Sequence, residues 1–399
     1  MENEGFLCRG REVFARISGM AEKKLKVAVL YGGKSGEHEI SLRSAASVIR
    51  QLDRERFEVI PVGIDKEGRW HLNQLSLIDA NPNALPLFSK VASESPLVAL
   101  PPTAPSGGPA LIPFGNPAQA QAIDVVFPVM HGPLCEDGTL QGLLELANVA
   151  YVGCGVLSSA VSMDKEVAKR LIRDAGLPIV PYVSAKQASY LKNSKALEAR
   201  VTQELGYPCF VKPANLGSSV GVHKVKDAAQ LHVALKDAFR FDGKVLIEKA
   251  IDAREIEIAA LENPDSSLPC LVSTVGEIVP KHEFYSYEAK YLDENGASLL
   301  IPANLNPAQM AEAQRVAREA FSALECEGMA RVDLFLDRGT GKFYFNEVNT
   351  IPGFTSISMY PKLWEATGIA YPALLSKLID LALARHQRQK KLTREFHAN

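Results

Sequence analysis

The sequence predicts a multidomain protein of the α/β class with α+β parts. Its 399 residues exceed the roughly 250–300 that one hydrophobic core usually accommodates, which predicts two or three domains. Short apolar runs alternate with amphipathic segments near the start, and two strand-like runs joined by a tight turn lie near the end. Hydrophobic residues make up 47% and charged residues 23%, as in ordinary globular proteins, which argues against wholesale disorder.

The first predicted domain opens with a strand–helix–strand unit. Residues 27–31 form a short apolar run before two glycines, which is typical of a buried parallel strand. Apolar residues at helical spacing predict a helix from Ser41 to Leu52, and residues 57–62 form the next strand. Residues 96–117 are rich in proline and predict a surface loop or insertion, after which residues 124–129 are again strand-like.

A helix predicted over residues 162–175, with Ser162 as its N-cap, marks the passage into a second domain. Strands at 209–212 and 244–248 flank a glycine-rich loop, and the alternating run 256–261 opens a third region. Residues 330–337 and 343–349 predict a β-hairpin. A helix from Tyr371 to about Ala384 follows, with a basic solvated end.

These elements divide the chain into four predicted segments. Residues 1–22 are expected to be a disordered extension, with Met20 as an alternative start. The N-terminal domain covers residues 23–161 and includes the proline-rich insertion at 95–120. A central domain then covers residues 162–250, and a C-terminal domain covers residues 251–390.

Composition disfavours several classes of protein. The 44 Lys and Arg residues nearly balance the 46 Asp and Glu residues, which argues against a dedicated nucleic-acid binder. No apolar stretch approaches the roughly 18–20 residues of a membrane-spanning helix, and the first 20 residues lack the apolar core of a signal peptide. The six cysteines form no CxxC pair, so we expect reduced thiols and a cytoplasmic protein rather than a disulfide framework or zinc site.

The predicted hairpin is the most informative feature. Strand alternation places Arg331 and Asp333 on one face, and it likewise pairs Glu347 with Asn349. Hard oxygen ligands of this kind suit Mg²⁺, and a nearby arginine suits phosphate or a developing negative charge. An ion-pair network on an exposed sheet face is the alternative, and the hairpin alone leaves both open.

Four loops could line the same site. Residues 214–221 are small and follow Lys212, so their backbone N–H groups could approach an anion, although an ordinary turn fits equally and the Walker A order is absent. The strand-to-helix turn at residues 32–35 presents Glu37, His38 and Glu39 to a cleft. The loop that begins at His131 follows a strand, as loops that line sites often do, although a structural turn fits equally well. Residues 285–292 could close over a ligand or could equally form an exposed loop.

Taken together, the segments resemble the D-alanine–D-alanine ligases of the ATP-grasp superfamily. The resemblance runs from residue 26 to 384 through GGKSGEHEISL, HGPLCEDGTLQG, SMDKEVAKRL, FVKPANLGSSVGV, YEAKY, ARVDLFL and NEVNTIPGFTSISMYP, in that order. It implies an ATP-grasp fold behind a Rossmann-like preATP-grasp domain, with three domains meeting at one cleft. It also implies a homodimer, the usual state in the family.

The resemblance implies an ATP site between the central and C-terminal domains. The phosphate-binding lysines would be Lys165, Lys212 and Lys290, with Ser219 in the glycine-rich loop. Glu248, Lys249 and Ile251 would lie along the adenine, and Glu255 would contact the ribose. Asp333, Glu347 and Asn349 would bind two Mg²⁺ ions, for which Mn²⁺ could substitute.

The implied reaction activates the carboxylate of one D-alanine as an acyl phosphate, which the amine of a second D-alanine attacks. Arg331 and the Gly353 backbone would stabilise the oxyanion. The first substrate would meet Glu37 and His131, and the second would meet Ser358 and the Met359 backbone. Ser218 and Tyr291 would join Glu37 in closing a lid, and the tyrosine predicts a dipeptide rather than a depsipeptide product.

Two alternative functions predict different residues at these positions. Another ATP-grasp ligase would share the nucleotide site but differ at Glu37, Tyr291 and Ser358, all of which match. A catalytically inactive ATP-binding regulator would lose one of the charged hairpin residues, and none is lost.

Overall fold

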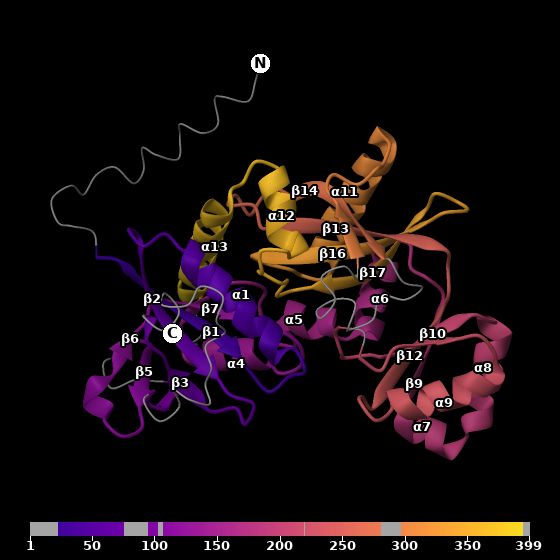
Figure 1. Ribbon diagram of the computed structural model, residues 1–399, viewed down its shortest axis with the longest axis horizontal. Coiled ribbons are helices and arrows are strands. Elements are labelled where there is room, and N and C mark those ends of the chain that lie inside the picture. The colour runs from indigo at the N-terminus through magenta and orange to yellow at the C-terminus, as the bar shows by residue number, and fades with distance from the viewer. Residues whose placement is uncertain (1–22, 76–94, 103–106, 219, 281–296, 394–399) are drawn as a thin grey trace, which may run out of the picture.

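Three large β-sheets organise the protein in a computed structural model that describes residues 23–75, 95–102, 107–218, 220–280 and 297–393, and a small fourth sheet accompanies the first of them. They occupy three lobes, an indigo-to-purple N-terminal lobe, a central lobe carrying β9, β10 and β12, and an orange C-terminal lobe (Figure 1). The expected extension 1–22 lies outside the described residues, as do Ser219, Lys290 and Tyr291.

The N-terminal sheet is built on the predicted strand–helix–strand unit. Its strand order is β3-β2-β1-β7-β8, with β1 parallel to both β2 and β7. The elements are β1 (Leu25–Gly32), α1 (His38–Gln51), β2 (Phe57–Ile64), β3 (Trp70–Leu72), β7 (Val125–Val129), α4 (Thr139–Leu146) and β8 (Ala150–Tyr151). The apolar runs form strands because both faces of β1 are buried, so the α/β prediction is confirmed here.

The proline-rich segment is not devoid of regular structure, so that prediction was wrong. It forms a small antiparallel sheet of β4 (Val98–Ala99), β5 (Ala110–Pro113) and β6 (Gln121–Ala122), with the short 3₁₀ helix η1 (Pro117–Gln119) between the last two strands. Val98, Leu100 and Leu111 are buried in the core of the N-terminal lobe. Burial of these side chains outweighs the prolines, which very short strands tolerate.

The predicted helix over 162–175 is two helices, α5 (Val156–Met163) and α6 (Lys165–Asp174). Ser162 lies inside α5, and Asp164 is the N-cap of α6. Its carboxylate accepts hydrogen bonds of 3.1 Å from the backbone N–H groups of Glu166 and Val167. The prediction of a Ser162 cap was therefore wrong, because the carboxylate two residues later caps the second helix.

The central sheet is antiparallel, in the order β11-β10-β12-β9. Its strands are β9 (Tyr182–Lys186), β10 (Cys209–Pro213), β11 (His223–Val225) and β12 (Lys244–Lys249), and its helices are α7 (Gln187–Lys192), α8 (Ser194–Glu204) and α9 (Ala228–Ala238). The helices gather on the outer side of the lobe (Figure 1). Val211 and Ile247 pack with these helices, so the alternate positions Lys212 and Glu248 lie on the opposite face of the sheet.

The C-terminal sheet follows the order β15-β14-β13-β16-β17, all antiparallel. Its strands are β13 (Ala253–Leu261), β14 (Leu271–Pro280), β15 (Ala297–Leu300), β16 (Met329–Asp337) and β17 (Phe343–Asn349). Helices α11 (Pro307–Ala323) and α12 (Met359–Ala366) cover opposite faces, since Ile256 and Ile258 pack with α11 while Ala259 and Leu261 pack with α12. The predicted hairpin is confirmed as β16–β17.

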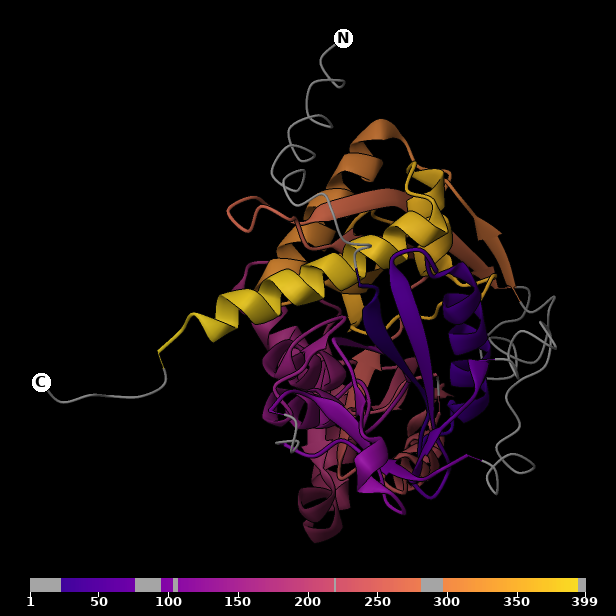
Figure 2. The ribbon, with the colours of Figure 1, turned by 90° about the vertical axis from the view of Figure 1, so that its left-hand side faces the viewer.

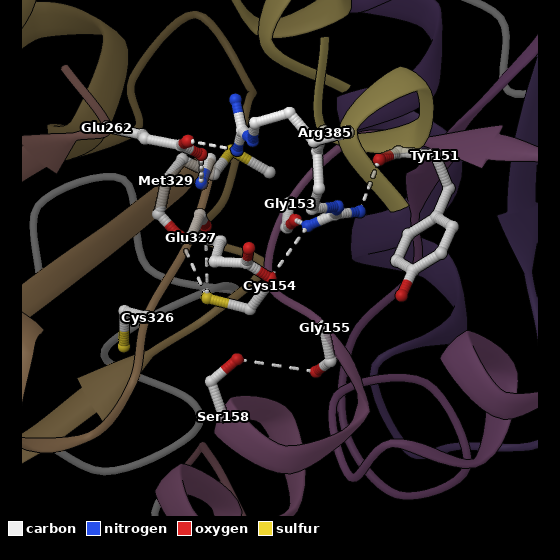
Figure 3. Close-up of polar contacts among 12 residues, drawn as sticks. Tyr151, Gly153, Cys154, Gly155, Ser158, Glu262, Cys326, Glu327, Met329 and Arg385 are labelled. Carbon is white, nitrogen blue, oxygen red and sulfur yellow. Dashed lines mark hydrogen bonds and ion pairs between the residues drawn. The ribbon is translucent and has the colours of Figure 1, made fainter. Parts of the chain in front are cut away.

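Helix α13 (Tyr371–Lys390) joins the C-terminal lobe to the N-terminal sheet, across which it lies (Figure 2). It extends beyond the predicted end, and Arg385 is buried rather than solvated. Its guanidinium donates to the carbonyls of Tyr151 and Gly153, stacks 4.4 Å from the Tyr151 ring centroid and lies 3.5 Å from a carboxylate oxygen of Glu327 (Figure 3). These contacts explain why the basic segment stays helical and packed.

Among the described residues, no single helix is both long and apolar enough to cross a membrane. Helices α12 and α13 reach that length and composition only as a pair, and they meet at 105°. Their apolar side chains belong to the core shared with the N-terminal sheet.

Candidate active site

The charged residues of the β16–β17 hairpin come together as their spacing predicts. Arg331 lies opposite Asn349, and Asp333 lies opposite Glu347. The Arg331 guanidinium donates two hydrogen bonds of 2.7 Å to the Asp333 carboxylate, to which the Asn349 amide also donates at 2.9 Å. The hairpin therefore presents a bidentate arginine–carboxylate pair on the face that also carries the other two polar groups.

Glu257 on β13 completes this cluster, and sequence reasoning missed it. It pairs with Asp333 on the neighbouring strand β16, and its carboxylate is 3.1 Å from Arg331 Nε. Although burial opposes it, the two carboxylates raise the pKa of Arg331 well above its ordinary value. The alternation along residues 253–261 was the available signal, because it puts Glu255 and Glu257 on one face.

The hairpin also offers a donor set that suits a hard divalent cation. Asp333 and Glu347 supply carboxylates and Asn349 supplies an amide oxygen, all from adjacent strands. Among the residues that the structure describes, no group of three or more His, Cys, Asp and Glu side chains is placed to hold a metal. The site would therefore combine two carboxylates with the amide. Its chemistry fits Mg²⁺ better than a soft metal.

Two lysines on α6, four residues apart, each lie close to a carboxylate. Lys165 donates to the carbonyl of Leu216 at 2.7 Å and lies 3.2 Å from Glu347. Lys169 is almost completely buried, with its ammonium 2.7 Å from Glu248. Its role was missed because nothing in a helical lysine predicts which distant strand it contacts.

Glu248 on β12 lies between Lys169 and Lys212, which is 2.5 Å from its other carboxylate oxygen. Burial opposes ionisation, but the two ammonium groups lower the pKa of Glu248 to about 2. Lys212 also lies over the Phe335 ring, 5.9 Å from its centroid. The central and C-terminal sheets thus meet through buried charges.

The other residues expected along a nucleotide lie next to this contact. Lys249 is the exposed last residue of β12, and Ile251 lies in the connection to β13. Glu255 is half-buried, on the same face of β13 as Glu257. The structure therefore brings these positions to the junction of the two sheets.

Glu37 links the N-terminal and central lobes. It precedes α1 and is buried, and its carboxylate accepts a hydrogen bond from the Ser218 hydroxyl. Gly132 packs against it with φ +80°, and a Cβ at that position would lie 2.8 Å from Glu37 Oε2. Glycine is therefore required where this loop passes the carboxylate.

His131 and Glu136 belong to the loop that passes Glu37. His131 Nδ1 lies 3.1 Å from the Ile351 carbonyl, and burial lowers the pKa of its ring. Glu136 accepts a 2.7 Å hydrogen bond from the Gly132 N–H. Burial and the nearby Glu37 raise the pKa of Glu136 to about 8. Sequence reasoning identified this loop but missed Glu136, although the quoted motif contains it.

The segment after β17 returns to the same cleft. The Ser358 hydroxyl accepts a 3.0 Å hydrogen bond from the Thr355 N–H, and Ser358 precedes α12, which begins at Met359. A Cβ on Gly353 would lie 2.8 Å from Ser358 Oγ, so a side chain there would displace the Ser358 hydroxyl. The loop is tied to the N-terminal lobe where the Phe354 N–H donates to Ser44.

A separate cavity of about 930 Å³ contains none of these residues. It lies near Ser158, Arg318, Cys326 and Arg388, on the side of the lobe junction that faces α11 and α13. We identify the candidate site by the convergence of buried charged groups instead, because catalysis needs placed charges more than volume.

Comparisons with known proteins agree along most of the chain. The family models for the D-ala D-ala ligase N-terminus and C-terminus match residues 26–154 and 171–380. The chain is 57% identical over 377 residues to D-alanine--D-alanine ligase A of Bradyrhizobium diazoefficiens, covering 94% of this chain and 99% of the relative. It is 47% identical to the D-alanine--D-alanine ligase of Legionella pneumophila strain Corby, with 94% and 99% covered.

Solved structures give the same picture. The D-alanine-D-alanine ligase of Coxiella burnetii superposes with a TM-score of 0.80 at 36% identity, covering 92% of this chain and 96% of that one. The VanG D-Ala:D-Ser ligase of Enterococcus faecalis superposes with a TM-score of 0.78 at 34% identity, covering 90% and 100%.

Proposed function

The chain belongs to the D-alanine–D-alanine ligase family, and we propose a role in the ligation reaction for each residue of the site described above. The protein is an ATP-dependent ligase that joins two D-alanine molecules for peptidoglycan synthesis. The observation that carries the assignment of roles is the meeting of the arginine–carboxylate pair of β16 with the lysines of α6 and β10. A reaction that activates a carboxylate with ATP needs both kinds of group at one place.

The nucleotide binds between the central lobe, residues 162–250, and the C-terminal lobe, residues 251–390. Lys165 and Lys212 hold its phosphates, together with Lys290 and Ser219. Glu248, Lys249 and Ile251 line the base, and Glu255 contacts the ribose. The support is that the described members of this set lie on β10, along the β12–β13 connection and on the facing helix α6.

Asp333, Glu347 and Asn349 hold two Mg²⁺ ions, with Mn²⁺ as a possible substitute. When bound, the ions supply positive charge that offsets the phosphates. Their fit rests on the hard oxygen donors of the hairpin described above. Lys165 lies 3.2 Å from Glu347, so the same carboxylate also orients a phosphate-binding lysine.

The reaction forms and breaks two bonds in sequence. The carboxylate of the first D-alanine attacks the γ-phosphorus and ADP leaves, which gives an acyl phosphate. The amine of the second D-alanine attacks the carbonyl carbon, and phosphate leaves with the activated oxygen. After the amine attacks and before phosphate leaves, the former carbonyl oxygen carries a negative charge, to which Arg331 and the Gly353 N–H donate. One such oriented donor contributes about 3–4 kcal/mol in comparable sites.

Substrate orientation falls to the edges of the cleft. Glu37 accepts from the ammonium of the first D-alanine, near His131. Ser358 and the Met359 N–H hold the carboxylate of the second, a task that suits the start of α12 because its free N–H groups favour an anion. Ser218, bonded to Glu37, and Tyr291 close the lid and exclude water from the acyl phosphate.

We propose that the enzyme does not use D-lactate as its second substrate, a preference that rests on Tyr291. A relative named a D-Ala:D-Ser ligase shares the fold, so this choice needs a direct test. We also propose a cytoplasmic homodimer. The five free cysteines of the described residues suit a reducing compartment.

The test incubates purified protein with Mg²⁺-ATP and single D-amino acids or D-lactate, and follows ADP and the condensed product. D-alanine should stimulate ADP release and give D-alanyl-D-alanine. No D-alanine-dependent ADP release would overturn the proposed chemistry, and D-alanyl-D-lactate as main product at neutral pH would overturn the second-substrate assignment.

A further inference from the structure

Lys169 joins two lobes from inside the protein. Its side chain is 1% exposed, on the α6 face that also carries Lys165. Its ammonium lies 2.7 Å from Glu248 Oε1 on β12 and donates at 3.2 Å to the Phe345 carbonyl on β17. A single cation therefore contacts the central sheet and the edge strand of the C-terminal sheet.

Burying an ammonium at this position costs free energy unless paired charges and hydrogen bonds offset the loss of hydration. Burial lowers the pKa of Lys169, and Glu248 opposes that shift. A methionine of similar length would fill the same space without desolvating an ammonium. The ion pair with Glu248 and the hydrogen bond to the Phe345 carbonyl offset that cost, so the two partners and the ammonium depend on one another.

Glu248 is the partner with a chemical task. It also pairs with Lys212, which the proposed function assigns to ATP phosphates. A triphosphate at Lys212 would compete for that ammonium, whereas the Lys169 ammonium is buried and already engaged by Glu248 and the Phe345 carbonyl. Lys169 therefore keeps Glu248 ionised and oriented when Lys212 turns to the nucleotide.

We propose that Lys169 is a positioning residue that sets nucleotide affinity and base preference through Glu248. An ionised carboxylate only accepts hydrogen bonds, so it favours a base edge with an amino group, as in adenine, over a carbonyl edge, as in guanine. Through Phe345, Lys169 also fixes the strand that carries Glu347. This inference rests on the proposed nucleotide site and adds to it a residue outside the phosphate-binding set.

The experiment measures KM and kcat for ATP, GTP and D-alanine in Lys169→Met, with Arg170→Met as the control. Arg170 is a neighbour on the same helix with an exposed side chain. Losing one charged hydrogen bond should raise the KM for ATP about 10-fold. The KM for D-alanine should stay near the wild-type value, and the preference for ATP over GTP should fall. Arg170→Met should match wild type.

Glu248→Gln and the double variant Lys169→Met/Glu248→Gln separate positioning from general stability. If Lys169 acts through Glu248, the double variant should show no greater loss of ATP affinity than Glu248→Gln alone. This comparison also serves if Lys169→Met alone fails to fold, because the neutral pair removes the unpaired buried carboxylate.

Two outcomes would overturn the inference. One is an unchanged KM for ATP and an unchanged ATP:GTP preference in folded Lys169→Met. The other is a purely additive double variant in which the KM values for ATP and D-alanine rise together. A wild-type protein without D-alanine-dependent ADP release would instead refute the proposed function itself.

Discussion

Ser218 donates a hydrogen bond to Glu37 across the boundary between the central and N-terminal lobes. The bond joins the glycine-rich loop to the turn that precedes α1, two segments far apart in the chain. It fixes one carboxylate oxygen of Glu37, the residue proposed above to receive the ammonium of the first D-alanine. The contact between the two lobes and the proposed ammonium recognition therefore involve the same side chain.

Replacing Ser218 by alanine should weaken binding of the first D-alanine. With the hydroxyl gone, Glu37 loses a donor and its orientation, and we expect the KM for D-alanine to rise about 10-fold. The KM for ATP should change much less. Initial-rate kinetics at saturating ATP would measure this, with the exposed Ser189→Ala as control. An unchanged KM for D-alanine would contradict the role given to this bond.

Replacing Arg331 by alanine should reduce turnover far more than ATP binding. The guanidinium is proposed to meet charge that develops only during the reaction, so kcat should fall about 10²–10³-fold. Nucleotide affinity, measured by calorimetry, should stay within a few-fold. Arg331→Lys should recover only part of the rate, because an ammonium cannot reproduce the bidentate contact with Asp333. Equal losses in both quantities would make Arg331 a binding residue.

Glu136 should make stability depend on pH. Its pKa of about 8 in the folded protein lies above the ordinary glutamate value near 4.5. The folded state therefore holds a proton that the unfolded state has released, and the contribution of Glu136 to stability declines as pH rises from about 4.5 to about 8. Below the lower value, this contribution is fully present.

Urea unfolding of Glu136→Gln and wild type across that range should show the difference. As pH rises, the free energy of unfolding of the variant should increase relative to that of wild type, by at most about 1.4 kcal/mol per pH unit, because an amide does not ionise. The exposed Glu55→Gln serves as control. Parallel pH profiles for wild type and Glu136→Gln would show that Glu136 has the same pKa in the folded and unfolded states, which would contradict the prediction.

Arg385→Ala should destabilise the protein much more than Arg388→Ala. Arg385 is buried and donates to two backbone carbonyls, whose loss should cost about 2–4 kcal/mol. Arg388 is a matched control on the same helix, since its ion pair with Glu262 is 42% exposed on the arginine side and worth about 0–1 kcal/mol. Thermal unfolding followed by circular dichroism would compare them. Similar shifts in Tm would contradict the role of Arg385 as an interlobe contact.

Local sequence patterns predicted the elements whose structure depends on near neighbours. The hairpin followed from period-two alternation and a glycine turn, which explains why Arg331 and Asp333 were correctly placed on one face. Strands β1 and β2 likewise followed from apolar runs. The α6 start was misplaced by two residues because Ser162 and Asp164 are both competent caps.

The missed residues depend on contacts between segments that are distant in sequence. Glu257 joins the site only because β13 pairs with β16, and Lys169 only because α6 packs between two sheets. The strands in the proline-rich segment formed for a similar reason, since Leu111 finds a core that the local sequence does not reveal.

Helix α13 has a consequence for the order in which the protein is made. The carbonyl of Tyr151 receives its hydrogen bond from a residue 234 positions later in the chain. Apolar side chains of α13 also cover part of one face of the N-terminal sheet, against β7 and β8, in a core shared with Val27, Val29 and helix α1. During synthesis from the N-terminus, α1 can pack on this face early, but the part formed by β7 and β8 stays uncovered until the ribosome has released α13. The first lobe to emerge is therefore completed only after the other two have been synthesised.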